Sequence, residues 1–290
     1  MTFPLRIQSE IQPAIDRSAP SWLTALCWLA AGVALLHALY ILIGWFDAPL
    51  LDQHAFRQTQ TALSALWLQR GGPFFAYETP VVGSPWSIPF EMPIFQLLVA
   101  GVANLGIPLD SAGRLVSFAF LLAAAWPLRM LWRDLELPSV GFPIALALIL
   151  ASPQYVFWSR TFLVESCAWF MALMWLSLFV RFLRNEHIAH AIAAVSVGLL
   201  AVWAKATTFP AFALVGGLLV LPRFWRWLRA DRDLRGLASL VGITAVLALP
   251  FAGGVAWVHF SDSVKRLLLN GPSECAGIAV NAGLEPAAHA

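Results

Sequence analysis

Charged residues are scarce in this chain: Asp, Glu, Lys and Arg make up 12% of the 290 residues, whereas 60% are hydrophobic. Soluble globular proteins carry about 25% charged and about 45–50% apolar residues. The shortage of charge therefore excludes a soluble globular domain, and the abundance of apolar residues excludes a disordered chain. With a mean hydropathy of +0.74, the sequence predicts an integral membrane protein.

Cysteines and clustered basic residues are also few. Cys27 and Cys167 lie inside apolar runs and Cys275 stands alone near the end, which excludes a disulfide scaffold. The net charge is only +2, and no basic stripe with interleaved aromatic residues lies outside the apolar segments. We therefore expect no nucleic-acid partner.

Long apolar runs fill most of the chain. Residues 22–46 contain no charged side chain and exceed the roughly 20 helical residues that cross a bilayer. This run is too long for a signal-peptide core, so we interpret it as an uncleaved first span. The sequence thus predicts an all-α polytopic membrane protein of about seven spans. The six later spans are predicted at 112–132, 138–158, 162–183, 188–204, 209–221 and 237–258.

The basic residues set the orientation. Segment 93–107 is typical of a surface or re-entrant helix, because about 15 residues are too few to span a bilayer. With seven spans and a cytoplasmic N-terminus, 11 of the 18 basic residues are cytoplasmic, as the positive-inside rule requires. An eight-span arrangement with an outer N-terminus gives the same count. Only seven spans place the remaining charges on one outer face, so we favour them. The predicted parts are a cytoplasmic segment 1–21, a membrane module 22–258 with an outer loop 47–111, and an outer tail 259–290.

The outer loop is predicted to contain two juxtamembrane helices. From His54 onward, Phe56 and Trp67 fall on one side of a helical pattern and Arg57 and Gln58 on the other, which predicts an amphipathic helix in the membrane interface. Prolines at positions 80, 85, 89 and 93 then predict an irregular loop. Segment 93–107 is predicted to form the second helix.

Six charged residues lie on the predicted outer face, and the orientation of the spans alone does not explain their presence. A carboxylate among them can accept a proton from an attacking hydroxyl, and a cation can stabilise charge that develops on a phosphate leaving group. Such a cluster beside hydrocarbon suits a lipid phosphate substrate. The six residues are Asp52, Arg57, Glu91, Arg160, Glu165 and Lys205.

Structural interpretations of the same residues remain open at this point. Asp52 precedes the amphipathic helix and is a candidate N-cap, and Arg57 is long enough to reach membrane lipid phosphates. Glu91 is compatible with an ordinary loop acid, and Arg160 and Glu165 are close enough in sequence to form an ion pair. Glu165, however, lies within an apolar run, where an ionisable residue usually has a function.

Several short motifs follow one another in order along the chain. They are Asp52 followed by HAFRQTQTA at 54–62, FEMPI at 90–94, GRL at 113–115, SPQYVFWSR at 152–160 with Glu165, and AK at 204–205. This ordered set, across residues 22–270, resembles the multi-span glycosyltransferases of the C-type fold (GT-C), in the branch of protein O-mannosyltransferases and the aminoarabinose transferase of lipid A. The aminoarabinose enzymes usually have an acid directly after the first Asp and a Lys directly after the loop Glu, whereas this chain has Gln53 and Met92 there.

The resemblance implies transfer of a sugar from a polyprenyl-phosphate carrier to a lipid, glycan or protein, on the outer side of the bacterial inner membrane and with inversion. It implies catalytic roles for Asp52 and Glu165 and a divalent metal at Glu91. Three cations would hold the lipid phosphate. These cations are Arg57, Arg160 and Lys205.

Two other functions are also compatible with the sequence. A transporter or flippase for a lipid-linked sugar would also gather charges near one face, although we find no internal repeat of the kind that transporters show. GT-C enzymes normally continue with further spans, so we expect the chain to be truncated, by a frameshift near Asn270. A non-catalytic membrane partner of a transferase is the third hypothesis.

Overall fold

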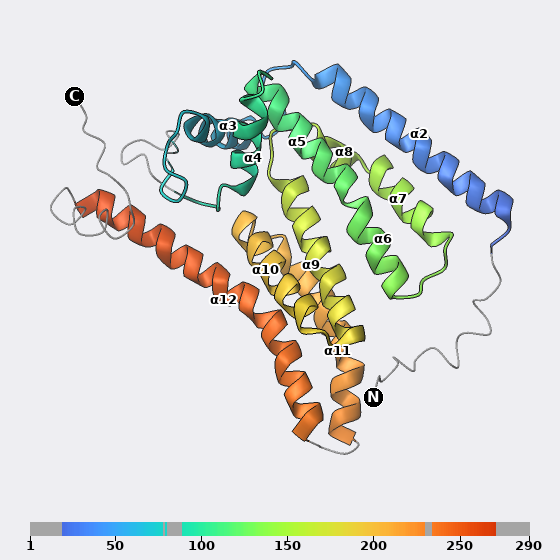
Figure 1. Cartoon of the computed structure of the whole chain (residues 1–290). Helices are drawn as coiled ribbons and strands as arrows, with labels where there is room; N and C mark the ends of the chain where they lie inside the picture. The colour runs from blue at the N-terminus through green and yellow to red at the C-terminus, as the bar shows by residue number, and fades with distance from the viewer. Residues whose placement is uncertain (1–18, 78, 80–88, 230–233, 271–290) are drawn as a thin grey trace.

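The structure is a computed structural model that describes residues 19–77, 79, 89–229 and 234–270. Across these residues all regular secondary structure is α-helical, which confirms the all-α prediction (Figure 1). The helices are α2 (Ser21–Trp45), α3 (Ala55–Gln69), α4 (Ile94–Ala103), α5 (Leu109–Ala123), α6 (Ala125–Asp134), α7 (Gly141–Ala151), α8 (Pro153–Ser159), α9 (Glu165–Asn185), α10 (Ile188–Ala204), α11 (Phe209–Arg229) and α12 (Leu234–Asn270).

Several of these helices are long and apolar enough to cross a membrane. Five qualify within the described residues, and a sixth is added if the bent pair α7 and α8 counts as one broken span. The five are α2, the nearly continuous α5 and α6, α9, α11 and α12. A multi-pass membrane protein is therefore confirmed. The predicted count of seven is not confirmed, because α10 has only 17 residues.

Packing against neighbours decides which face of each span is buried. On α2 the buried residues are Ala31, Ala34, Ala38 and Leu42, which recur at helical spacing and form one stripe against α7. The remaining surface of α2 is mostly apolar and largely exposed, as contact with lipid requires. At the centre of the bundle α9 packs against α5, α6, α10 and α11.

Ion pairs mark the two ends of the bundle. Glu165 is the first residue of α9 and pairs with Lys205, which directly follows α10, so α9 and α10 run antiparallel. The last turns of α9 pair with other acids, through Arg181 to Asp134 at 2.8 Å. Arg181 follows Glu165 by 16 positions on α9, so these two sets of charges lie about 24 Å apart along its axis. We call them the site end, at Glu165, and the opposite end, at Asp134.

Two helices near the site end show more than the sequence predicted. Helix α12 covers the predicted span 237–258 and continues as a helix to Asn270. Helix α3 is amphipathic as predicted, and its polar face packs inward: Gln58 and Ser64 are buried, whereas Phe56 is 61% exposed. The polar side chains of α3 therefore face the protein interior at the site end.

Candidate functional site

Asp52 lies in a tight turn that leads into α3. The amide of Ala55 donates to the carbonyl of Asp52 at 3.0 Å, and His54 adopts a left-handed conformation with φ of 63°. The Asp52 side chain makes no capping hydrogen bond to α3, so the N-cap interpretation is wrong. Its Oδ2 instead accepts a hydrogen bond from Nη1 of Arg160 at 2.7 Å, and its Oδ1 accepts one from the side-chain Nε2 of Gln58.

Arg160 is held in place from several sides. It follows α8, and its guanidinium lies 4.1 Å from the ring centroid of Trp45 and 5.0 Å from that of Phe157. The side chains of Arg160 and Asp52 are each only 13% exposed, so both charges are largely removed from water. A pair between Arg160 and Glu165 is not formed, because Asp52 is the ion-pair partner of Arg160. Cations over aromatic rings and opposite a carboxylate are well fixed.

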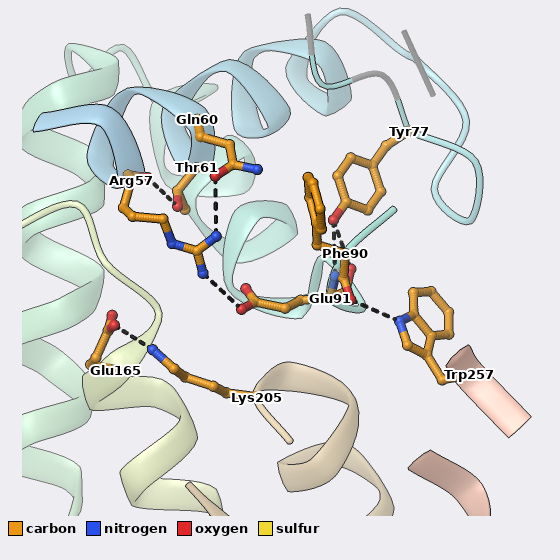
Figure 2. Close-up of polar contacts among 9 residues, drawn as sticks. All are labelled: Arg57, Gln60, Thr61, Tyr77, Phe90, Glu91, Glu165, Lys205 and Trp257. Carbon is orange, nitrogen blue, oxygen red and sulfur yellow. Dashed lines mark hydrogen bonds and ion pairs between the residues drawn. The ribbon is translucent and has the colours of Figure 1, made fainter. Parts of the chain in front are cut away.

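Arg57, on α3, reaches the loop that carries Glu91. Its Nη2 donates to Glu91 Oε1 at 3.1 Å and its Nη1 donates to Gln60 Oε1 at 3.1 Å (Figure 2). Burial raises the pKa of Glu91 above its ordinary value, and the positive charges of Arg57 and Lys205 oppose that rise only in part. Glu91 therefore holds its proton more readily than an exposed glutamate.

The loop around Glu91 is tied to other elements by its backbone. The Tyr77 hydroxyl donates to the carbonyl of Glu91 at 2.8 Å, and burial raises the pKa of Tyr77. The amide of Met92 donates to the carbonyl of Trp203 on α10 at 2.8 Å. From α12, Trp257 Nε1 donates to the carbonyl of Phe90 at 3.3 Å (Figure 2). The position of Glu91 thus depends on α10 and α12 together.

Lys205 and Glu165 form the third ion pair at the site end. Lys205 Nζ pairs with Glu165 Oε1, and both side chains are less than one-fifth exposed. The other carboxylate oxygen, Glu165 Oε2, is buried and has no hydrogen-bond partner among the described residues. Figure 2 shows this pair facing Arg57 and Glu91. The charge of Lys205 lowers the pKa of Glu91 and that of Glu165 raises it.

All six sequence-predicted site residues therefore lie at one end of the bundle, as three ion pairs. Each pair joins segments that are far apart in the sequence, so the cluster is assembled by the tertiary fold. The sum of the six formal charges is zero, with three carboxylates and three cations. The pairs are Asp52 with Arg160, Arg57 with Glu91, and Glu165 with Lys205.

An apolar cavity of about 420 Å³ opens beside this cluster. It lies between the loop and α12. Two of its lining residues are neighbours of the charged residues in the sequence: Met92 follows Glu91, and Trp203 precedes Lys205 by two positions. The arrangement places an apolar space next to paired charges. The lining residues are Phe75, Met92, Trp203, Gly253, Ala256, Trp257 and Phe260.

The resemblance implies a divalent metal at Glu91, whose ligands would come from the residues around it. Glu91 faces the guanidinium of Arg57, and no group of three His, Cys, Asp or Glu side chains suited to a metal occurs in the described part of the chain. A divalent cation is usually held by several oxygen or nitrogen ligands. The described residues therefore do not fit such a metal, and no chemical step is assigned to one.

The structure also adds residues that the sequence did not single out as part of the site. Gln58 binds Asp52, and Tyr77 holds the backbone of Glu91. Arg114 is buried on α5 and donates to the carbonyl of Phe46 at 3.1 Å, where the chain leaves α2 for the loop. The signal for Gln58 was its place on the polar face of α3. Nothing in the sequence indicated the contact of Tyr77.

Comparisons of the chain with protein-family models, with curated proteins and with solved structures find no match. The functional argument for this protein therefore depends on the arrangement of its own residues.

Proposed function

We propose that this protein is a membrane glycosyltransferase of the GT-C type that transfers a sugar from a polyprenyl-phosphate carrier to a lipid, glycan or protein acceptor. The observation that supports the proposal is the juxtaposition at the site end. A carboxylate fixed by two donors, Asp52, lies at the same end as two facing ion pairs and an apolar cavity. The bacterial inner membrane, with the site end on its outer side, is part of the proposal.

The proposed reaction is a single displacement with inversion at the anomeric carbon. The acceptor hydroxyl oxygen attacks that carbon, and the bond from the carbon to the phosphate oxygen breaks with its electron pair leaving on the phosphate. Asp52 accepts the proton of the hydroxyl as general base, because its carboxylate retains free lone pairs beside the hydrogen bonds from Gln58 and Arg160.

Arg57 and Lys205 are the proposed partners of the leaving phosphate. The two cations lie on facing sides of the cluster, and Arg57 is 44% exposed, so it has donors free for an incoming anion. Arg160 keeps Asp52 in position and adds a third positive charge. Glu165 Oε2 is buried and has no hydrogen-bond partner in the described part of the chain, so it suits a hydroxyl of the sugar. The apolar cavity suits the polyprenyl chain.

A reconstituted transfer assay tests the proposal. Asp52→Asn and Lys205→Ala are each expected to lower the rate of sugar transfer by about 100-fold or more, since they remove the base and a phosphate partner. Asp134→Asn is the matched control, because its pair with Arg181 has similar length and burial at the opposite end. Purified protein in liposomes would receive polyprenyl-phosphate hexoses and pentoses, and free and transferred sugar would be measured.

The same assay separates the competing hypotheses. A transporter would move the labelled carrier between leaflets without cleaving its phosphate–sugar bond. A non-catalytic partner would be inactive alone and would raise the activity of an added full-length transferase. Either result, or unchanged transfer by both Asp52→Asn and Lys205→Ala, would overturn the proposal.

A further inference from the structure

Gln58 is a fully buried polar residue that lies in contact with Asp52 and is separate from the six charged residues of the cluster. Its Nε2 donates to Asp52 Oδ1 and to the carbonyl of Gln53 at 3.0 Å. Its Oε1 accepts from the amide of Phe162 at 3.0 Å. Both ends of the side-chain amide are therefore used.

The chemistry of these partners fixes the orientation of the Gln58 amide. The carboxylate of Asp52 and the carbonyl of Gln53 are acceptors, and the amide of Phe162 is a donor. A flipped amide would place its oxygen against two acceptors and its NH₂ against an N–H group. Only one orientation is thus compatible with the surroundings, and in it Gln58 donates both of its protons toward the turn of Asp52.

The Phe162 side of the network is equally rigid. Phe162 is fully buried, and its ring lies against Gly113, where an added Cβ would come within 2.1 Å of it. Ser117 Oγ donates to the carbonyl of Thr161 at 2.8 Å in the same turn. Because Arg160 begins this turn, Gln58 links the Asp52 side chain to the backbone of the turn that carries Arg160.

We propose that Gln58 is a positioning residue of the transfer reaction, whose amide holds the Asp52 carboxylate in register with Arg160 and with the α8–α9 turn. This inference rests on the proposed function, since it needs Asp52 to be the base. Gln58 is not among the residues that line the cavity, and its side-chain hydrogen bonds go to Asp52, Gln53 and Phe162 rather than to the Arg57 and Lys205 side chains that would bind the donor. It acts only through Asp52.

Two substitutions separate positioning from folding. Gln58→Leu keeps the approximate volume and removes all the hydrogen bonds of the amide. It is expected to lower kcat by about 100-fold, the cost of a misplaced reacting group, with KM for the polyprenyl-phosphate sugar unchanged within about two-fold. Gln58→Glu keeps the shape and the acceptor toward Phe162, and it places a second carboxyl group against Asp52.

The pH profile of Gln58→Glu is the readout that a purely structural role would not change. Two adjacent carboxyl groups do not both ionise readily, so the pKa of the base rises and activity on the acid side is lost at higher pH than in the unchanged protein. The other charged groups around Asp52 are the same in both proteins. Arg160 is the ion-pair partner of Asp52, and Arg114 interacts electrostatically with Asp52 as well as with Asp47, Asp110 and Arg160.

Controls make the outcome specific. Gln96→Leu replaces another buried glutamine, on α4, and is expected to keep full activity. Adding Gln58→Leu to Asp52→Asn is expected to cause no further loss, because Gln58 acts only through Asp52. Unchanged kcat in Gln58→Leu, an unshifted pH profile in Gln58→Glu, or an equal further loss in the double variant would overturn the inference alone. Full activity of Asp52→Asn would also overturn this inference, and full activity of both Asp52→Asn and Lys205→Ala would overturn the proposed function.

Discussion

Gly198 is a point of close approach between three helices, and the effect of enlarging it can be worked out from the structure. A Cβ at position 198 on α10 would lie 2.6 Å from Pro250 Cγ on α12 and 2.7 Å from Trp175 Cδ1 on α9. Both neighbours are rings, and Trp175 is fully buried and stacked on Phe179 with centroids 5.2 Å apart. Neither ring can rotate away, so Gly198→Ala requires the helices to move apart.

The size of the effect follows from overpacking. Forcing an extra methyl group into a packed core costs about 1–3 kcal/mol. Alanine also has a better helix propensity than glycine by about 1 kcal/mol, which partly offsets this cost. Gly217→Ala, on α11, gains the same propensity without a clash, because nothing lies within 4 Å of its added Cβ. The difference between the two variants therefore isolates the packing term.

The measurement is the thermal midpoint of the purified protein in detergent. A chain of this size shifts by about 2–4 °C per kcal/mol, so Gly198→Ala is expected to unfold about 2–12 °C below Gly217→Ala. Transfer activity should fall too, since α10 carries Lys205 at its end and its movement separates Lys205 from Glu165. Equal midpoints for the two alanine variants would show that the three helices do not pack as described.

Two further predictions concern the charge and the sidedness of the site end. The raised pKa of Glu91 means that folding stability falls as the pH increases from the ordinary value of 4.5 through the raised pKa, because the folded protein binds the proton more tightly. Glu91→Gln should flatten the dependence of the thermal midpoint on pH, whereas Glu136→Gln, at the opposite end, should leave it unchanged. If the two variants gave the same curve of midpoint against pH, the prediction would be wrong. In a background without native cysteines, Leu51→Cys should react with a membrane-impermeant maleimide on intact cells and Leu137→Cys should not. Both leucines are exposed, and reversed labelling would place the site end in the cytoplasm.

Hydrophobic runs alone located most of the long helices. The expected spans at 22–46 and 162–183 correspond to Ser21–Trp45 and Glu165–Asn185, since apolar length is the dominant constraint on a membrane helix. The run 138–158 was predicted as one span but is broken into α7 and α8, bent by 66°. Ser152 precedes Pro153 and has an extended ψ of 122°, which the proline ring favours. The Ser-Pro pair was a visible signal of this break.

The sequence predicted which residues gather at the site end, but not how they pair. Sidedness follows from counting spans and basic residues, whereas pairing depends on how separate helices pack. Arg160 and Glu165 are five positions apart, yet Arg160 pairs with Asp52 across 108 positions and Glu165 pairs with Lys205 across 40. The buried turn between α8 and α9 directs the two side chains to different partners. Such a separation cannot be read from local spacing.

Ion pairing by itself does not distinguish a reactive site from a structural one in this protein. Charges that are removed from water must be paired wherever they lie, and the pair of Arg181 and Asp134 at the opposite end has the same chemistry as that of Arg160 and Asp52. Within the described residues, the site end has three features besides its ion pairs: a buried carboxylate oxygen with no hydrogen-bond partner, a buried side-chain amide that donates to Asp52, and an apolar cavity beside the charges. A structural pair needs none of these features. Asp52→Asn and Asp134→Asn should therefore have similar effects on stability and very different effects on sugar transfer.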